Sequence, residues 1–158
     1  MTALTVNKQR PVKLPPGGLR FVKVKLAGYT NFGGGSTAHT VYHGSIVAQD
    51  VSDTDGYSRA VGFTPASGDV FMGVAIEKQQ VTSSDAADGS VEVTVAANGV
   101  WGFPKASLAQ TDVGADIYCT DDDAVQSSST NALKIGRLEE VDGTYAWINI
   151  APYFGVAT

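Results

Sequence analysis

Apolar and polar residues alternate over short runs of this chain. In the sequence LRFVKVKL, residues 19–26, the side chains of Val22, Val24 and Leu26 fall on one face of an extended chain and the others on the opposite face. An alternation with a period of two is typical of a strand that is buried on one side. The pattern therefore predicts a half-buried strand over these residues.

A second alternating run lies at residues 90–97, SVEVTVAA. Here Val93 and Val95 share one face, and Glu92 lies on the other. Asn98 and Gly99 follow directly, and both residue types tolerate a positive φ. The run predicts another half-buried strand, and the Asn-Gly pair predicts a hairpin that returns the chain alongside it.

From residue 44 onward, glycines separate the apolar runs at regular intervals. Runs of strand length occupy residues 45–51, 70–77, 90–97, 100–103, 115–119, 133–141 and 144–150. This spacing is typical of β-barrels and sandwiches. We expect an all-β fold, a small glycine-punctuated barrel or sandwich, in a single domain of residues 19–158. Only residues 83–87 and 105–110 have the composition of a short helix.

Residues 1–18, called the arm below, have a different composition. They contain Pro11, Pro15, Pro16 and the pair Gly17 and Gly18. Proline fixes φ and lacks a backbone donor, so this composition resists both helix and central strand and favours an extended path. The sequence predicts an extended N-terminal arm that precedes the barrel or sandwich.

The positive charge is concentrated near the N-terminus. The first 25 residues contain no acid and six cations, which are Lys8, Arg10, Lys13, Arg20, Lys23 and Lys25. The remaining residues carry five basic side chains against all 16 acidic ones, and the net charge is -5. This split predicts that the arm docks on an acidic surface of its own body, a neighbouring copy or a different partner. We assign that contact to Lys8, Arg10, Pro11, Lys13, Pro15 and Pro16.

Several classes of partner and location are disfavoured by the sequence. The acidic body repels phosphates, so we expect no direct contact with nucleic acid. No run approaches the ~18 to 20 apolar residues of a membrane span, and we find no secretory signal at the N-terminus. The single cysteine, Cys119, cannot form an intrachain disulfide, and its neighbours predict a buried strand residue. We expect a soluble protein that is made in the cytoplasm.

The candidates for chemistry are few. The only histidines are His39 and His43, which no flanking triad motif supports, and on a strand their imidazoles lie about 13 Å apart. This separation disfavours zinc within one chain, although a metal site between subunits stays open. Cys119 lacks a catalytic context. We therefore expect no enzyme, no catalytic residue and no cofactor.

Two acidic segments are candidates for calcium loops. Residues 121–123 are three consecutive aspartates without the spacing or the closing Glu of a helical calcium loop, and consecutive acids in a turn predict a solvated tip. Asp50, Asp53 and Asp55 alternate in a more calcium-like way, but the site also needs backbone carbonyls and a distant carboxylate that the sequence does not identify. We expect no metal, and leave binding at these loops open.

The aromatic residues have two interpretations. Trp101, Trp147 and Tyr145 would form a sugar-binding platform if their rings were exposed on one surface. Both tryptophans lie in strand-like runs, which favours a place in the core or at a subunit interface. The C-terminal sequence APYFGVAT is apolar and aromatic. We expect its aromatic rings to be packed, and the candidate interface residues are Trp101, Trp147, Tyr153 and Phe154.

Six motifs follow one another through residues 44–150, which are GSIVAQD, DVFMGVAIE, VEVTVAANGVWGFPKA, VGADIYCTDDDAV, LKIGRLEE and TYAWINI. In this succession the stretch resembles a family of small bacteriophage capsid decoration (cement) proteins with a compact β-barrel core. VGADIYCTDDDAV looks like the family's Gly-x-x-Val-Tyr-x-Asp element. The resemblance implies a structural virion protein on the capsid surface, commonly a homotrimer at local threefold positions, that binds the major capsid protein and reinforces the head. Family members often use an extended N-terminal segment for that contact. The loop at residues 33–35 departs from the compact pattern.

Three other functions remain compatible with the sequence. A phage tail or head-fibre component would show the same glycine-punctuated β pattern. A carbohydrate-binding β module would use Trp101, Trp147 and Tyr145. A small hydrolase is the least favoured, because no nucleophile, base or metal constellation stands out.

Overall fold

Strands account for nearly all the regular structure of this chain. The computed structural model describes residues 3–32, 36–52 and 54–153. No α-helix occurs in these ranges, a 3-10 turn covers Gln110–Asp112, and no helix there is long and apolar enough to cross a membrane. Residues 83–87 and most of 105–110 form turns instead of the short helices that their composition allowed. The predicted all-β class is confirmed.

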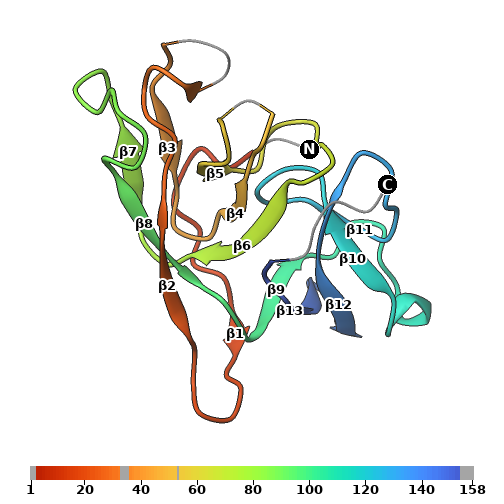
Figure 1. The fold of residues 1–158 in the computed structure, drawn as a ribbon. Coiled ribbons are helices and arrows are strands. Elements are labelled where there is room, and N and C mark those ends of the chain that lie inside the picture. The colour runs from red at the N-terminus through yellow and green to blue at the C-terminus, as the bar shows by residue number, and fades with distance from the viewer. Residues whose placement is uncertain (1–2, 33–35, 53, 154–158) are drawn as a thin grey trace.

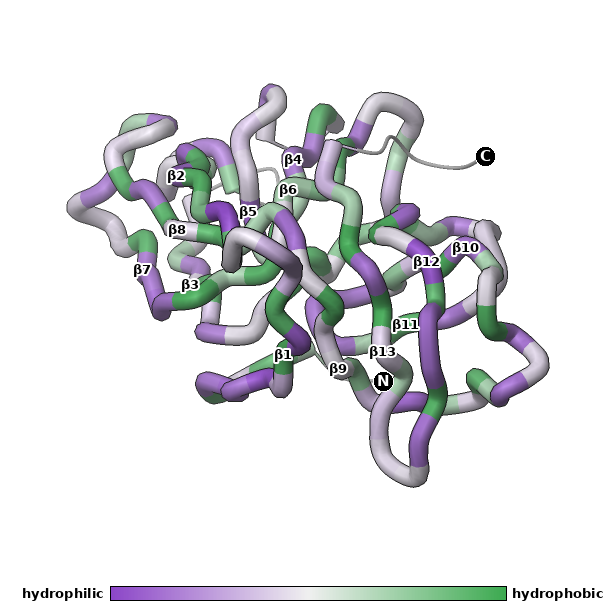
Figure 2. Tube along the Cα trace, turned by 90° about the horizontal axis from the view of Figure 1, so that it is seen from below, coloured by the Kyte–Doolittle hydropathy of each residue, from purple (hydrophilic) through white to green (hydrophobic). Residues whose placement is uncertain are grey.

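One antiparallel sheet contains six strands in the order β1-β9-β13-β12-β10-β11 (Figure 1). Its strands are β1 (Val12–Lys13), β9 (Val100–Pro104), β10 (Asp116–Cys119), β11 (Val125–Gln126), β12 (Leu133–Val141) and β13 (Tyr145–Ile150). Hydrophobic and hydrophilic positions alternate along β12, as Figure 2 shows, because one face packs and the other meets solvent. β1 brings part of the arm into this sheet.

A second sheet contains five antiparallel strands in the order β2-β8-β6-β4-β5. Its strands are β2 (Phe21–Lys25), β4 (Ile46–Gln49), β5 (Ser58–Ala60), β6 (Val70–Ala75) and β8 (Glu92–Ala96). The sheet curls until the end of β2 meets β5 through a parallel bridge between Leu26 and Ser58. A small two-stranded sheet of β3 (His39–Val41) and β7 (Gln79–Val81) lies beside it.

Two hydrophobic clusters hold these sheets together. The larger lies between the six- and five-stranded sheets and includes Phe71, Phe103 and Ile148. The smaller joins the other face of the five-stranded sheet to β3 and β7 through Val41 and Val81. The five-stranded sheet is therefore the middle layer, and its strands β4 and β6 contribute side chains to both clusters, which explains their nearly continuous apolar sequences.

The faces predicted for the two alternating strands are confirmed. On β8, the exposed fractions of Val93 and Val95 are 0%, and Glu92 is exposed. On β2, Val24 is buried while Lys23 and its neighbours on the opposite face are exposed. Alternation read from the sequence was sufficient here because each strand has only one packed face.

The buried position predicted for Cys119 is also confirmed. Its side chain is fully buried on β10, in the cluster between the two large sheets. Burial raises the pKa of the thiol far above its usual range, because the thiolate would lose its hydration. Cys119 is therefore a packing residue.

The hairpin predicted at Asn98 and Gly99 is wrong. β8 belongs to the five-stranded sheet and β9 to the six-stranded one, so the two strands do not pair. Gly99 has a φ of +105°, and Asn98 accepts a hydrogen bond from Arg20 N at 2.7 Å and donates one to Gly18 O at 3.2 Å. The pair forms a corner at which the chain changes sheets. The same positive φ serves either a hairpin or a corner, and the packing of the flanking strands decides between them.

Candidate functional site

The arm lies along its own body. Leu4 N donates a hydrogen bond to Asp122 Oδ1 at 2.8 Å, and Lys8 N donates one to His43 O at 2.7 Å. Further along, β1 pairs with β9 in the register Val12 to Trp101. An extended segment with prolines satisfies its remaining backbone groups by lying at a sheet edge, where a missing donor is tolerated. The arm is extended as predicted, and the edge it covers belongs to the six-stranded sheet.

Arg10 fixes the arm to the body. Arg10 is 4% exposed, and its guanidinium lies 4.2 Å from the centre of the Phe103 ring. Nε donates to Gly44 O at 2.6 Å, and Nη2 donates to Asp122 O at 3.2 Å and to Asp123 Oδ1 at 2.7 Å. Burial lowers the pKa of Arg10, and the charge of Asp123 opposes that shift. A buried cation with these partners holds one geometry.

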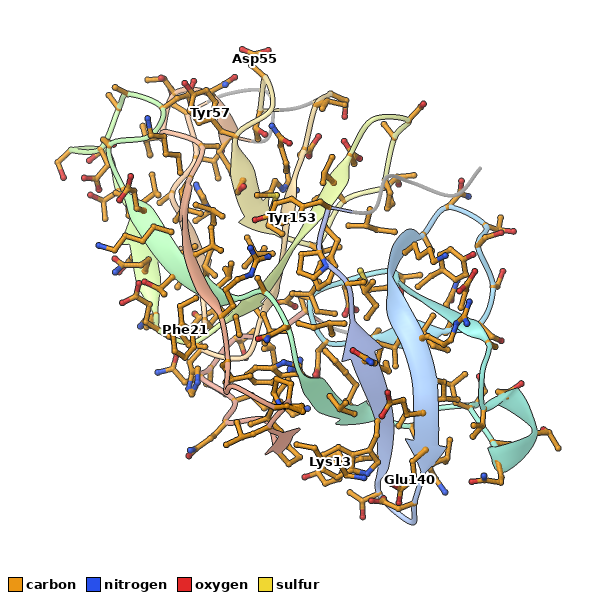
Figure 3. All side chains as sticks on the ribbon, turned by 60° about the horizontal axis from the view of Figure 1, so that its bottom comes forward. Lys13, Phe21, Asp55, Tyr57, Glu140 and Tyr153 are labelled. Carbon is orange, nitrogen blue, oxygen red and sulfur yellow. The ribbon has the colours of Figure 1, made fainter. Side chains whose placement is uncertain are left out.

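The other cations assigned to the arm also meet acids of this chain. Lys8 Nζ lies 3.0 Å from Asp123, and Lys13 Nζ donates a hydrogen bond to Glu140. Figure 3 shows Lys13 and Glu140 side by side at one end of the six-stranded sheet. Of the three acidic surfaces that the sequence left open, the described contacts use the chain's own body.

The three prolines assigned to the arm shape its path. Pro11 O accepts a hydrogen bond from Gly102 N at 2.9 Å, so Pro11 lies against β9. Pro15 and Pro16 lie in the segment of residues 14–20, called the β1–β2 loop below, which projects from one end of the molecule in Figure 1. Gly18 N donates to Pro15 O at 2.9 Å, and this closes a tight turn in the loop.

The β1–β2 loop carries exposed apolar side chains. Leu14 is 67% exposed and Phe21, which follows the loop at the start of β2, is 53% exposed. Arg20 is exposed between them along the chain. Asn98 holds the base of the loop through its bonds to Gly18 and Arg20. The loop is therefore anchored, and its apolar groups face solvent.

The three aspartates at residues 121–123 receive the arm, so the prediction of a solvated tip is wrong. Asp122 is 1% exposed and accepts a hydrogen bond from Ser45 Oγ at 2.6 Å, and burial raises its pKa. Asp121 accepts bonds from the backbone of Asp123 at 2.8 Å and of Ala124 at 2.6 Å. The arm supplies two cations, Lys8 and Arg10, to Asp123 and the backbone donor of Leu4 to Asp122, and these partners take the place of solvent.

A second buried charge lies between the five-stranded sheet and β3. Asp50 is fully buried 3.4 Å from Arg59, whose guanidinium sits between the rings of Phe32 at 4.5 Å and Phe63 at 4.6 Å. Phe32 stacks on His39 at 3.9 Å between ring centres. The sequence around Arg59 carries no signal for this contact, because its aromatic partners come from separate loops. Of the aspartates weighed with Asp50 as a calcium loop, Asp55 is exposed and Asp53 lies outside the described residues.

The histidines have structural contacts. His39 Nε2 donates to Ala27 O at 2.9 Å, and burial lowers the pKa of His39. His43 N donates to Asn7 Oδ1 at 3.1 Å, which adds another contact to the arm. In the part of the chain that the structure describes, no three His, Cys, Asp or Glu side chains are grouped to hold a metal ion.

The two tryptophans do not share a surface. Trp101 is 4% exposed and donates from Nε1 to Asn98 O at 2.9 Å. Trp147 is partly exposed, but the ammonium of Lys13 lies 4.5 Å from its ring centre, and Tyr145 meets its edge at 5.8 Å. A sugar platform of all three rings is therefore not formed, because Trp101 faces the core.

The C-terminal aromatic residues were expected to be packed. Tyr153 is instead 49% exposed, with a φ of +73°, so its ring does not pack within the chain, and its assignment to a subunit interface stays a prediction. Its backbone N donates to Phe71 O, which turns the chain at the end of the six-stranded sheet and leaves the ring outside. Phe154 lies outside the described residues.

A groove runs between the two end strands of the five-stranded sheet. We call it the seam, and it is lined by Val22, Lys23, Val24, Lys25, Gln49, Gly56, Tyr57, Ser58 and Met72, with a volume of about 370 Å³. Phe21 and Tyr57 lie toward its two ends in Figure 3. No local sequence pattern marks the seam. β2 and β5 are far apart along the chain, and the curl of the sheet brings them together.

The chain was compared with known proteins in three ways. A scan against protein-family models, a search of curated proteins and a search of solved structures all find no match. The site is therefore defined by its geometry alone: an arm closed on its own acidic body, an exposed β1–β2 loop, and the seam beside β2.

Proposed function

We propose that this chain is a structural virion protein that binds the outer surface of a bacteriophage capsid as a decoration protein and stabilises the head. It acts without catalysis, by contact with the major capsid protein, and a homotrimer on the capsid surface is its working form. The resemblance of residues 44–150 to capsid decoration proteins supports this proposal. The all-β fold with a rigidly held arm also fits a protein whose work is binding.

The observation that carries the proposal is the β1–β2 loop. Leu14 and Phe21 expose more than half of their surface beside the cation Arg20, although the loop is anchored at its base by Asn98. Exposed apolar side chains on a fixed projection gain free energy when a partner covers them, and little conformational entropy is lost on binding. The loop is therefore the proposed capsid contact, in place of the arm cations, which already pair within the chain.

The test measures binding to heads assembled from the major capsid protein of the same virus, by co-sedimentation and electron cryomicroscopy. We expect the protein to occupy local threefold positions. The double variant Leu14→Ser and Phe21→Ser should bind more than about tenfold more weakly, which is about 1.4 kcal/mol. Val113→Ser is the matched control, because Val113 is also exposed, at 39%, but lies far along the chain from this loop.

Two outcomes would overturn the proposal. Absence of head binding together with self-assembly into rings, seen by light scattering and imaging, would favour a tail component. Binding to a glycan array that is lost in Trp147→Ala would favour a carbohydrate-binding module. Equal head binding by the loop double variant and Val113→Ser would remove the loop from the contact.

A further inference from the structure

We propose that the seam binds an extended acidic segment of another protein, which adds to β2 as a further strand. Within the proposed function this segment belongs to the capsid protein, and in naming that partner the inference rests on the function proposed above.

The edge of β2 has unused pairing capacity. β2 is an end strand, and its bonds to β8 involve Arg20 O, which accepts from Ala97 N at 2.8 Å, and Leu26 N, which donates to Val91 O at 2.9 Å. In an antiparallel ladder the bonded residues alternate along a strand, so the backbone groups of Phe21 and Lys23 point away from β8. Within the described residues no other strand lies beside these two groups.

The seam offers an added strand apolar contacts, called its floor below, as well as backbone groups to pair with. Val22, Val24 and Met72 line the groove from the cluster shared with β3 and β7, and Tyr57 lines its other wall. The five residues of β2 span about 17 Å at the usual rise of a strand. Alternate side chains of a bound segment would therefore meet this apolar floor while its backbone pairs with β2.

The charge of the seam selects an acidic occupant. Lys23 and Lys25 are exposed on the same face of β2, and Arg20 precedes them. These three side chains form no ion pair with any residue in the described ranges, in a chain whose net charge is -5. In the described ion pairs the acids meet other cations, which are Lys8, Arg10, Lys13, Arg59, Lys134 and Arg137. Carboxylates at alternate positions of a bound strand would supply the missing partners.

A second copy of this chain does not fit the seam. If two β2 edges paired antiparallel, their lysines would be brought face to face, and like charges directly opposite each other destabilise a strand pair. Lysines at an edge discourage such self-pairing in many proteins. The same lysines attract a strand of opposite charge, so the seam favours a different protein over a second copy.

The probe is a synthetic nine-residue peptide that alternates Glu and Val, mixed with the full chain. Binding is followed by fluorescence anisotropy and by the backbone amide shifts of Phe21 and Lys23. We expect the peptide to bind, and Lys23→Glu to weaken binding at least tenfold. Lys105→Glu, with the same charge change outside the seam, should bind like the wild type. A peptide with Lys in place of Glu should bind Lys23→Glu better than the wild type.

A third peptide separates strand pairing from charge attraction. Methylation of alternate backbone nitrogens keeps all the charges but removes the donors that face β2, so its binding should be lost. Equal binding of the methylated peptide, or equal binding by Lys23→Glu and Lys105→Glu, would overturn the inference. Failure of the acidic peptide to bind at all would also overturn it.

Head binding distinguishes the two proposals. If the acidic peptide binds the seam but the protein does not bind heads, the seam stands and the capsid function fails. If heads bind Lys23→Glu and Lys105→Glu equally and the peptide does not bind, the capsid function stands and the seam fails.

Discussion

The two large sheets of this protein treat their edges differently. At the β9 edge of the six-stranded sheet, the arm adds β1, pairs Val12 with Trp101 and is fixed by Arg10. At the β2 edge of the five-stranded sheet, the described residues supply one bridge, between Leu26 and Ser58, and the rest of the edge lines the seam. An uncovered edge invites pairing. The N-terminal segment therefore covers one sheet edge. At the other edge, the lysines of β2 are what disfavours pairing with a second copy.

The largest loss of stability is expected for Val93→Asp, which disrupts the strand that supports the open edge. Val93→Asp places a carboxylate at a position that is 0% exposed on β8, the partner of β2. It should lower the free energy of unfolding by about 4 kcal/mol or more, because the charge loses its hydration without a partner. Glu92→Ala, on the exposed face of the same strand, should change it by less than about 0.5 kcal/mol. Urea denaturation measures both, and similar small effects would mean that the faces of β8 are reversed.

The next variant tests the closed edge. Arg10→Met removes the buried guanidinium and leaves Asp123 and the carbonyl of Gly44 without its hydrogen bonds. Loss of one partner of a buried ion pair costs about 3 to 5 kcal/mol. Lys8→Met is the control, since the Lys8 side chain is 35% exposed and its pair with Asp123 should contribute about 1 kcal/mol at most. If both variants have equal urea midpoints, Arg10 does not hold the arm.

A smaller change should convert the closed edge into an open one. A methyl group on Gly102 would lie 2.7 Å from Pro11 Cγ and 3.3 Å from Tyr145 Cγ, so Gly102→Ala should push Pro11 off β9. Overpacking of this kind costs about 1 to 3 kcal/mol. Hydrogen exchange at the amide of residue 102, which bonds to Pro11 O, should accelerate. Gly143→Ala meets nothing within 4 Å and is the neutral control; unchanged exchange in Gly102→Ala would contradict this close packing.

The smallest effect is expected for the pH dependence of stability that comes from His39, which lies beside the five-stranded sheet. Burial lowers the pKa of His39, so the fold favours the neutral imidazole. Its contribution to stability is present above the ordinary pKa of about 6.5 and is lost as pH falls through the lowered value. His39→Gln keeps a donor for Ala27 O and cannot titrate. Urea midpoints between about pH 7.5 and about pH 5.5 should fall less in the variant, and an unchanged slope would contradict the role of His39.

Some features of the fold could be read from residues close together in the chain. The faces of β2 and β8 and the burial of Cys119 follow from alternation and from neighbouring apolar residues, because a strand with one packed face records that face in its own sequence. The extended path of the arm follows from its prolines in the same way. The split between a basic arm and an acidic body predicted contacts between opposite charges, and Lys8 and Arg10 do meet Asp123.

Other features depended on residues that the fold brings together from a distance. The corner at Asn98 and Gly99 has the local sequence of a hairpin, and only the separate burial of Val93 and Trp101 sends β8 and β9 into different sheets. The exposure of the Tyr153 ring also depends on distant residues. An apolar C-terminal sequence does not specify whether a packing surface lies within reach.

The sequence by itself determined that this protein is all-β, which faces of its alternating strands pack, and that its basic arm seeks acidic partners. The folded arrangement of the strands was needed to show that those partners are acids of the same chain, and that β2 and β5 meet at one end and leave the seam open. The physical reason is range: alternation and local charge act between near neighbours, whereas sheet order, edges and grooves depend on contacts between strands far apart in the sequence.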